Sequence, residues 1–172
     1  MAENLEQTKG LYVRNTTIIA ALVGVVIGAV LCGAVILGIM PSKMIVTAES
    51  AMGFDETVEG LQKAIVDANW VVSGVLDVNK SMASKGIEFE PRVKIVQLCS
   101  PKHARSVLTS SMAMSAMMPC AVSVWVGDDD KVYVSRMNTG FMAAMLGGDA
   151  GRIMGGEVVP AEKAILSGIV KD

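Results

Sequence analysis

The side chains best suited to chemistry in this sequence are two cysteines and one histidine. Cys99 and Cys120 are the only cysteines beyond an apolar run near the N-terminus, and His103 is the only histidine. Ser100 and Pro101 predict the start of a helix directly after Cys99, where free backbone N–H groups favour a thiolate. His103 falls in the first turn of that helix and Cys120 opens a later strand, so we expect the sheet to bring all three together.

These residues allow four interpretations. A Cys99–Cys120 disulfide would close a loop of about 20 residues and add about 3 kcal/mol of stability in the loop-entropy model. A soft transition metal or a haem iron would instead be bound by Cys99, His103, Cys120 and Met118. A redox-active thiol pair would exploit the helix N-terminus beside Cys99. In the fourth interpretation both cysteines are buried apolar fillers and His103 lies on a helix surface.

Methionine is the second unusual feature, because the chain has 13 methionines and only 4% aromatic residues. Thioethers bind Cu(I) or an axial haem position, and flexible methionine surfaces also accept varied partners. We favour a role as core and interface filler. Most of these residues form two groups, one before Cys120 and one after the expected hairpin: Met112, Met114, Met117, Met118, Met137, Met142, Met145 and Met154.

The soluble part of the chain is expected to form one α+β domain over residues 44–172, with mixed strands and helices. Strands are expected at 44–48, 70–76, 92–99, 121–126 and 131–137, the last two as a hairpin around Asp128, Asp129 and Asp130. Helices are expected at 54–68, from Ser100 through Leu108, at 140–146 and at 160–170, with a helical turn at 78–85. The glycine-rich stretch 147–156 is expected to be a loop.

An uncharged run from Thr16 to Met40 predicts a transmembrane helix, about 37 Å long at 1.5 Å per residue. The apolar run is longer than that of a cleavable signal peptide, so we expect an uncleaved anchor after a cytoplasmic tail, residues 1–15. The few flanking basic residues place the C-terminal domain outside the cytoplasm, on the cell membrane. Gly24 and Gly28 form a G-x-x-x-G pattern that favours close packing with another membrane helix.

Composition argues against several classes of function. The chain has 15 basic and 17 acidic side chains, so it lacks the positive surface of a nucleic-acid-binding protein. A Ser-His-Asp hydrolase is not indicated, because the serines have no recognisable nucleophile spacing to the single histidine. The chain has no C-x-x-C-H motif for covalent haem attachment and too few ligands for a structural zinc site.

Four groups of residues stand in order along the soluble part: Gly53-Phe54-Asp55-Glu56-Thr57-Val58 with Trp70, Cys99-Ser100-Pro101-Lys102-His103-Ala104, Met118-Pro119-Cys120, and Lys131-Val132-Tyr133-Val134-Ser135-Arg136-Met137-Asn138. Together they resemble the bacterial and archaeal family called domain of unknown function 302, specifically its cysteine-bearing branch. The resemblance covers nearly the whole soluble part, in order, and implies a TATA-binding-protein-like α+β fold in a subunit that pairs with itself. It implies no established reaction.

These observations predict a single-span accessory subunit that pairs with itself or joins a larger membrane complex and has no catalysis of its own. The alternative is a membrane-anchored redox protein, binding a metal or haem through Cys99, His103 and Cys120 and carrying electrons.

Overall fold

The computed structural model describes residues 20–34 and 42–171. The chain divides into two units, Met1–Ser42 and Lys43–Asp172. Of the predicted membrane segment 16–40, residues 20–34 form a helix, while 16–19 and 35–40, like the tail 1–15, lie outside the described residues. No helix in the described ranges is both long and apolar enough to cross a membrane.

The helical residues 20–34 contain the predicted G-x-x-x-G pair. Gly24 and Gly28 lie one turn apart on it, and a methyl group added at either position would meet no other atom within 4 Å. The pair therefore lies on an open helix surface within this unit.

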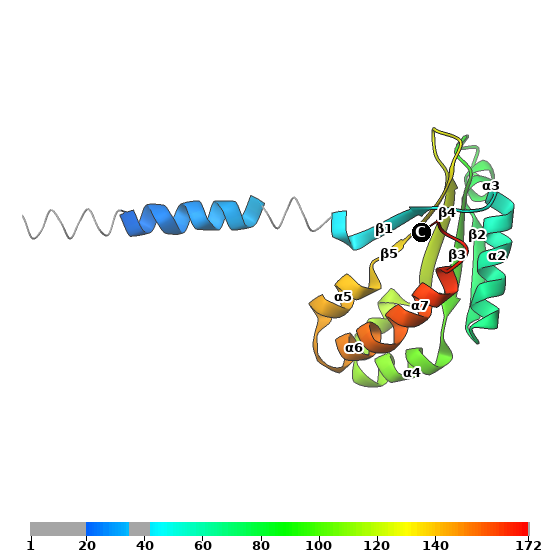
Figure 1. Cartoon of the computed structure of the whole chain (residues 1–172). Helices are drawn as coiled ribbons and strands as arrows, with labels where there is room; N and C mark the ends of the chain where they lie inside the picture. The colour runs from blue at the N-terminus through cyan, green and yellow to red at the C-terminus, as the bar shows by residue number, and fades with distance from the viewer. Residues whose placement is uncertain (1–19, 35–41, 172) are drawn as a thin grey trace, which may run out of the picture. The chain divides into compact units, whose positions relative to one another are not determined.

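The second unit is built on a five-stranded antiparallel sheet with the order β1-β5-β4-β3-β2. The strands, labelled in Figure 1, are β1 (Ile45–Glu49), β2 (Val71–Asp77), β3 (Val93–Cys99), β4 (Cys120–Val126) and β5 (Val132–Met137). This confirms all five expected strands within two residues at each end. The β4–β5 hairpin turns at the expected acidic tip, where Asp130 has a φ of 58°.

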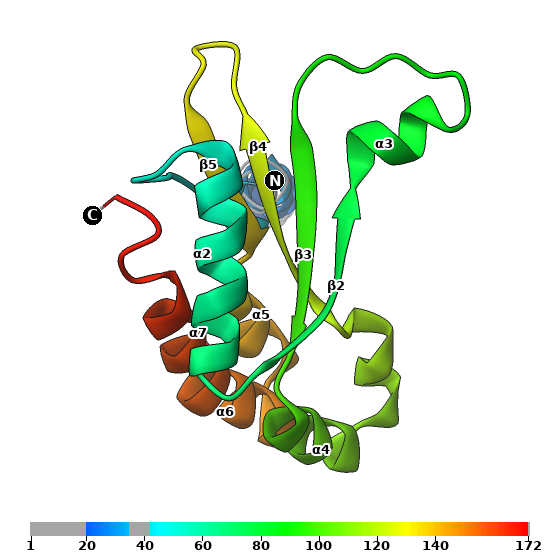
Figure 2. The same cartoon turned by 90° about the vertical axis from the view of Figure 1, so that its right-hand side faces the viewer.

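Helices lie on one face of the sheet and at both ends of its strands (Figures 1 and 2). They are α2 (Phe54–Asp67), α3 (Val78–Ala83), α4 (Pro101–Ser110), η1 (Met112–Met117), α5 (Thr139–Leu146), α6 (Gly148–Ile153), η2 (Met154–Val158) and α7 (Val159–Leu166). The helix α4 begins as predicted, with Pro101 in its first turn and the Ser100 hydroxyl accepting a hydrogen bond from the His103 N–H.

The main core lies between one face of the sheet, helix α2 and the C-terminal segment. Leu61 and Ile65 of α2 are fully buried against Val96 of β3 and Val124 of β4. The apolar spacing along α2 explains this packing, because residues three and four apart share one helix face. The polar start of the helix is satisfied locally, since the Gly53 N–H donates to the Glu56 carboxylate.

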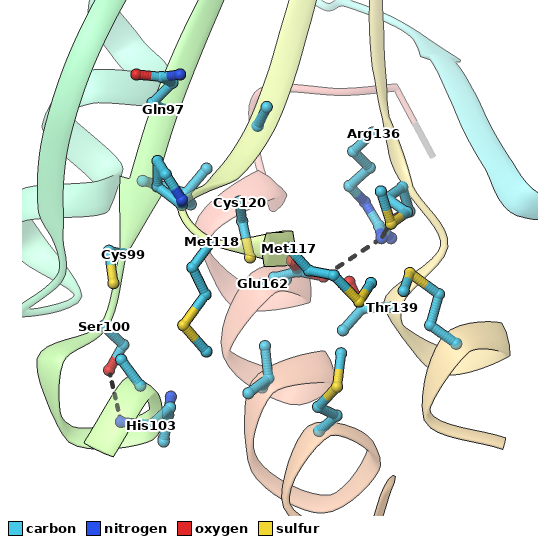
Figure 3. A pocket seen from close by; sticks show the side chains of 18 of the residues that line it. Gln97, Cys99, Ser100, His103, Met117, Met118, Cys120, Arg136, Thr139 and Glu162 are labelled. Carbon is cyan, nitrogen blue, oxygen red and sulfur yellow. Dashed lines mark hydrogen bonds and ion pairs between the residues drawn. The ribbon is translucent and has the colours of Figure 1, made fainter. Parts of the chain in front are cut away.

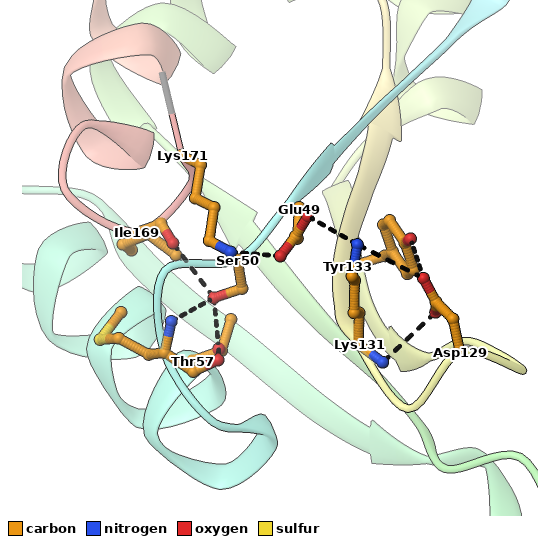
Figure 4. Close-up of polar contacts among 9 residues, drawn as sticks. Glu49, Ser50, Thr57, Asp129, Lys131, Tyr133, Ile169 and Lys171 are labelled. Atoms are coloured by element: carbon orange, nitrogen blue, oxygen red, sulfur yellow. Dashed lines mark hydrogen bonds and ion pairs between the residues drawn. The ribbon is translucent and has the colours of Figure 1, made fainter.

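Polar contacts fasten the C-terminal segment to β1 and α2 (Figure 4). The Ser50 hydroxyl contacts Thr57 Oγ1 at 2.7 Å and donates to the Ile169 carbonyl at 3.1 Å. Glu49 pairs with Lys171 and with Lys131, and the hydrogen bond from Lys171 lowers the pKa of the Glu49 carboxyl. These contacts hold the chain end against the sheet and leave the helices α4 to α7 to form the opposite end of the domain.

The prediction of a loop at 147–156 is wrong, because this stretch folds into α6 and η2. Its glycines are used for contact between helices. A Cβ on Gly151 would lie 2.4 Å from the carbonyl oxygen of Ala143 in α5, so only glycine allows the two helices to approach this closely. Local sequence rules penalise glycine in helices, but here tertiary packing outweighs that penalty.

Candidate functional site

A cavity of about 570 Å³ lies where the open face of the sheet meets α4, η1, α5 and η2 (Figure 3). Its wall is mainly apolar, with a few polar groups, which is typical of small-molecule and cofactor sites. Cys99, His103, Met118 and Cys120 all line it. The fold therefore brings the four predicted site residues to one cavity.

Both predicted cysteines are free thiols, which contradicts the disulfide interpretation. The sheet register explains why: Cys120 lies opposite Leu98, so Cys99 is one residue further along β3. Successive side chains of a strand point to opposite faces, so the two Cβ atoms do not face each other as a disulfide requires. Met118 is seen between the two thiols in Figure 3.

Burial raises the pKa of the Cys120 thiol to about 11, with smaller contributions from the charges of Glu162 and Cys99. At neutral pH this side chain is a protonated, weakly nucleophilic thiol. The observation counts against the interpretation of a reactive thiol pair.

The raised Cys120 pKa predicts slow alkylation. Relative to its ordinary value of 9.0, a pKa of about 11 lowers the thiolate fraction at pH 7.5 about 100-fold. We expect iodoacetamide to label Cys120 of the native chain at least that much more slowly than in the chain unfolded in guanidinium chloride. Peptide mapping by mass spectrometry gives both rates, and equal rates would contradict the prediction.

His103 contacts two neighbours from other elements of the domain. Its ring packs edge-on against Trp70, with 5.6 Å between ring centroids, and its Nε2 lies 3.5 Å from Oε2 of Glu157 in η2. Only 15% of the His103 side chain is exposed, so it is not the helix-surface residue of the fourth interpretation.

Methionines provide much of the cavity wall. Six of the eight that the sequence singled out line it, whereas Met112 and Met145 are exposed and do not. The six are Met114, Met117, Met118, Met137, Met142 and Met154. Most are contributed by helical segments on either side of the cavity, so the two groups recognised in the sequence meet in space.

A buried polar triad that sequence reasoning missed also lines the cavity. Glu162 of α7 is 7% exposed, accepts a hydrogen bond of 2.7 Å from Thr139 and faces Arg136 at 3.4 Å. Two spacings in the sequence indicate that these side chains face the interior. Arg136 follows Val134 at the two-residue spacing of core-facing strand positions, and Glu162 precedes the buried Leu166 by one helical turn. These groups neutralise one another and join β5, α5 and α7.

The triad predicts a pH dependence of stability. Burial raises the pKa of the Glu162 carboxyl above 4.5, although Thr139 and Arg136 oppose the shift. A carboxyl with a raised folded-state pKa favours folding below its unfolded pKa and loses that contribution as the pH rises through the folded value. We expect Glu162→Gln to gain stability relative to wild type as the pH rises from 4 to 7.

Urea unfolding at several pH values measures this difference. Glu88→Gln removes a carboxylate at an exposed position and controls for the loss of one charge. A Glu162→Gln curve that runs parallel to wild type over this range would contradict the prediction.

Cys99, His103 and Cys120 do not form a ligand set by themselves. Among residues 20–34 and 42–171, no three side chains of the His, Cys, Asp and Glu types come close enough to hold a metal ion. The other soft donors that line the cavity are methionine thioethers.

Comparison with known proteins agrees with this fold. No curated protein matches the sequence. A crystal structure titled as an uncharacterized conserved protein DUF302 from Bacillus stearothermophilus matches 73% of this chain and 98% of its own, with a TM-score of 0.66 and 19% identity, which shows a shared fold. The family model for the domain of unknown function DUF302 matches residues 46–165. This chain therefore belongs to the DUF302 family.

Proposed function

We propose that the chain is a membrane-anchored accessory subunit that acts by binding and not by catalysis. The observation that carries this proposal is the apolar, methionine-lined cavity, whose charged groups Arg136 and Glu162 are paired with each other. The Glu162 carboxylate is held by Arg136 at 3.4 Å and by Thr139 at 2.7 Å, which leaves it little freedom to reach a substrate. Thioethers, in contrast, adapt to ligands and partners of varied shape.

The anchor belongs to the same proposal. The uncharged run 16–40 is long enough to cross a bilayer, and the positive-inside rule places the domain outside the cytoplasm. Gly24 and Gly28 would then provide the surface for helix packing, either with a second copy or with another subunit of a membrane complex. Self-pairing and the TATA-binding-protein-like arrangement, both implied by the family resemblance, complete the proposal.

Native purification in mild detergent, with mass measured by light scattering, tests this function. We expect a dimer or a larger complex with a companion protein. The double variant Gly24→Leu, Gly28→Leu is expected to reduce association, while Gly33→Leu, on another part of the helix, serves as its control. A lone monomer with no companion would overturn the proposal.

A second candidate function is electron transfer by a metal or haem bound in the cavity. The observation that favours it is the gathering of soft donors, since two thiols, one imidazole and six thioethers line the same space. An absorption spectrum and elemental analysis of protein from its native membrane test this directly. Stoichiometric metal or haem would support it, and a colourless, metal-free protein would rule it out.

A further inference from the structure

The cavity contains a polar atom whose environment is unusual. His103 Nδ1 is buried and has no hydrogen-bond partner, alone among the buried side-chain nitrogen and oxygen atoms in the described part of the chain. Leaving such an atom unsatisfied costs about 1–3 kcal/mol. Because buried polar atoms of folded proteins nearly always have a partner, this nitrogen is well suited to bind a group from outside the chain.

The other nitrogen of the same ring has a carboxylate neighbour. Nε2 lies 3.5 Å from Glu157 Oε2, so the tautomer of the neutral ring that suits this contact has its proton on Nε2. In that tautomer Nδ1 carries a free lone pair. Histidines that bind metals commonly donate their second N–H to a carboxylate, which fixes the ring and makes the free nitrogen a better ligand.

Thioethers lie on the same side of α4 as His103. Val107 follows His103 by one helical turn and is buried with Met114, while Met117, Met118 and Met154 pack against this cluster. Met154 lies in η2 together with Glu157, and it lines the same cavity as His103. The segment that places Glu157 beside the histidine thus also contributes a methionine to the same cavity.

The charge of the ligand groups determines which ions the cavity favours. Thioethers and a neutral imidazole carry no charge. Bringing an ion into an apolar cavity without compensating charge is costly, and the cost grows steeply with ionic charge. Sulfur ligands also prefer soft ions, so a soft monovalent ion is favoured over Zn²⁺ or another divalent metal.

We propose that the cavity binds Cu(I), or another soft monovalent ion, through His103 Nδ1 and methionine thioethers that include Met118 and Met154. The inference rests on the second candidate function and deepens it. It replaces the predicted set of Cys99, His103, Cys120 and Met118 by one in which imidazole and thioethers are the ligands and the thiols are dispensable.

The test uses the full chain in detergent with Cys32, Cys99 and Cys120 replaced by serine, so that thiols cannot bind the metal. Cu(I) is titrated in competition with bicinchoninate, and Ag(I) serves as a redox-inert probe for NMR. We expect one equivalent to bind. Because the chain has one histidine, its two ring ¹⁵N signals are unambiguous, and the Nδ1 signal is expected to shift on Ag(I) addition far more than the Nε2 signal.

Methionine-to-leucine variants test the thioethers without removing much packing volume. In the same thiol-free background, Met118→Leu and Met154→Leu are each expected to weaken Cu(I) binding about 10-fold or more. Met112→Leu is the matched control, because Met112 is 72% exposed and does not line the cavity. Circular dichroism spectra identical to the parent's establish that the variants are folded.

Four results would overturn the inference. Binding that survives in wild type but disappears in the thiol-free chain would assign the metal to cysteines and leave the second candidate function standing. Binding unchanged by both leucine variants, or without a shift at Nδ1, would place the metal elsewhere. Absence of binding to either chain, while native protein contains haem, would overturn this inference alone.

Discussion

Gly151→Ala is expected to lower the free energy of unfolding by about 2 kcal/mol, because the new methyl group overpacks a tight helix contact. Its Cβ would lie 2.4 Å from the Ala143 carbonyl oxygen, an atom of the backbone that cannot rotate away. Helices α5 and α6 must therefore separate. Met142 and Met154, which line the cavity from α5 and η2, would shift with them.

Gly156→Ala is the matched control for this prediction. Gly156 lies in the same helical run, is exposed, and has no atom within 4 Å of an added Cβ. Alanine is favoured over glycine in helices by about 1 kcal/mol, so this variant is expected to be as stable as wild type or more stable. Urea unfolding of both variants measures the difference. Equal stability of the two would mean that Gly151 is not needed for the helix contact.

Leu61→Ala is expected to have the largest effect, a loss of about 3 kcal/mol with a fall in melting temperature of roughly 10 °C. Leu61 is fully buried between helix α2 and the sheet, where the surrounding strands cannot readily collapse into the space left by its side chain. The cost includes both the lost burial and the cavity that remains.

Val66→Ala on the same helix provides the comparison. Val66 is 60% exposed, and its truncation is expected to change stability by no more than about 0.5 kcal/mol. Thermal unfolding followed by circular dichroism measures both variants. A small loss for Leu61→Ala, similar to that for Val66→Ala, would show that α2 does not cover the core of the sheet.

Strong local signals predicted most elements of the domain. Ser100 and Pro101 specify the start of α4 because a side-chain cap and a proline both suit a helix N-terminus. The alternation of Val132 and Val134 and the acidic turn specify the β4–β5 hairpin in the same way. These features depend on neighbouring residues only, so a sequence pattern was sufficient to identify them.

The helices at 147–156 and the short helix η1 were not predicted, because their formation depends on distant residues. Glycine disfavours a helix locally, and its use at Gly151 becomes evident only when α5 lies against it. The Arg136–Glu162 ion pair was not predicted for the same reason, because its two residues are 26 positions apart and meet through packing of α7 on the sheet.

The sequence alone identified the cysteine, histidine and methionine side chains and the order of most strands and helices, because residue type and local periodicity can be read from neighbouring residues. Only the tertiary structure decided how those side chains meet. The strand register kept Cys99 and Cys120 apart as free thiols, and the helix packing gathered six methionines around them. The tertiary structure also buries His103 Nδ1 without a hydrogen-bond partner, and this atom is the basis of the proposed metal site. Such contacts are set by the whole fold, which no short stretch of sequence encodes.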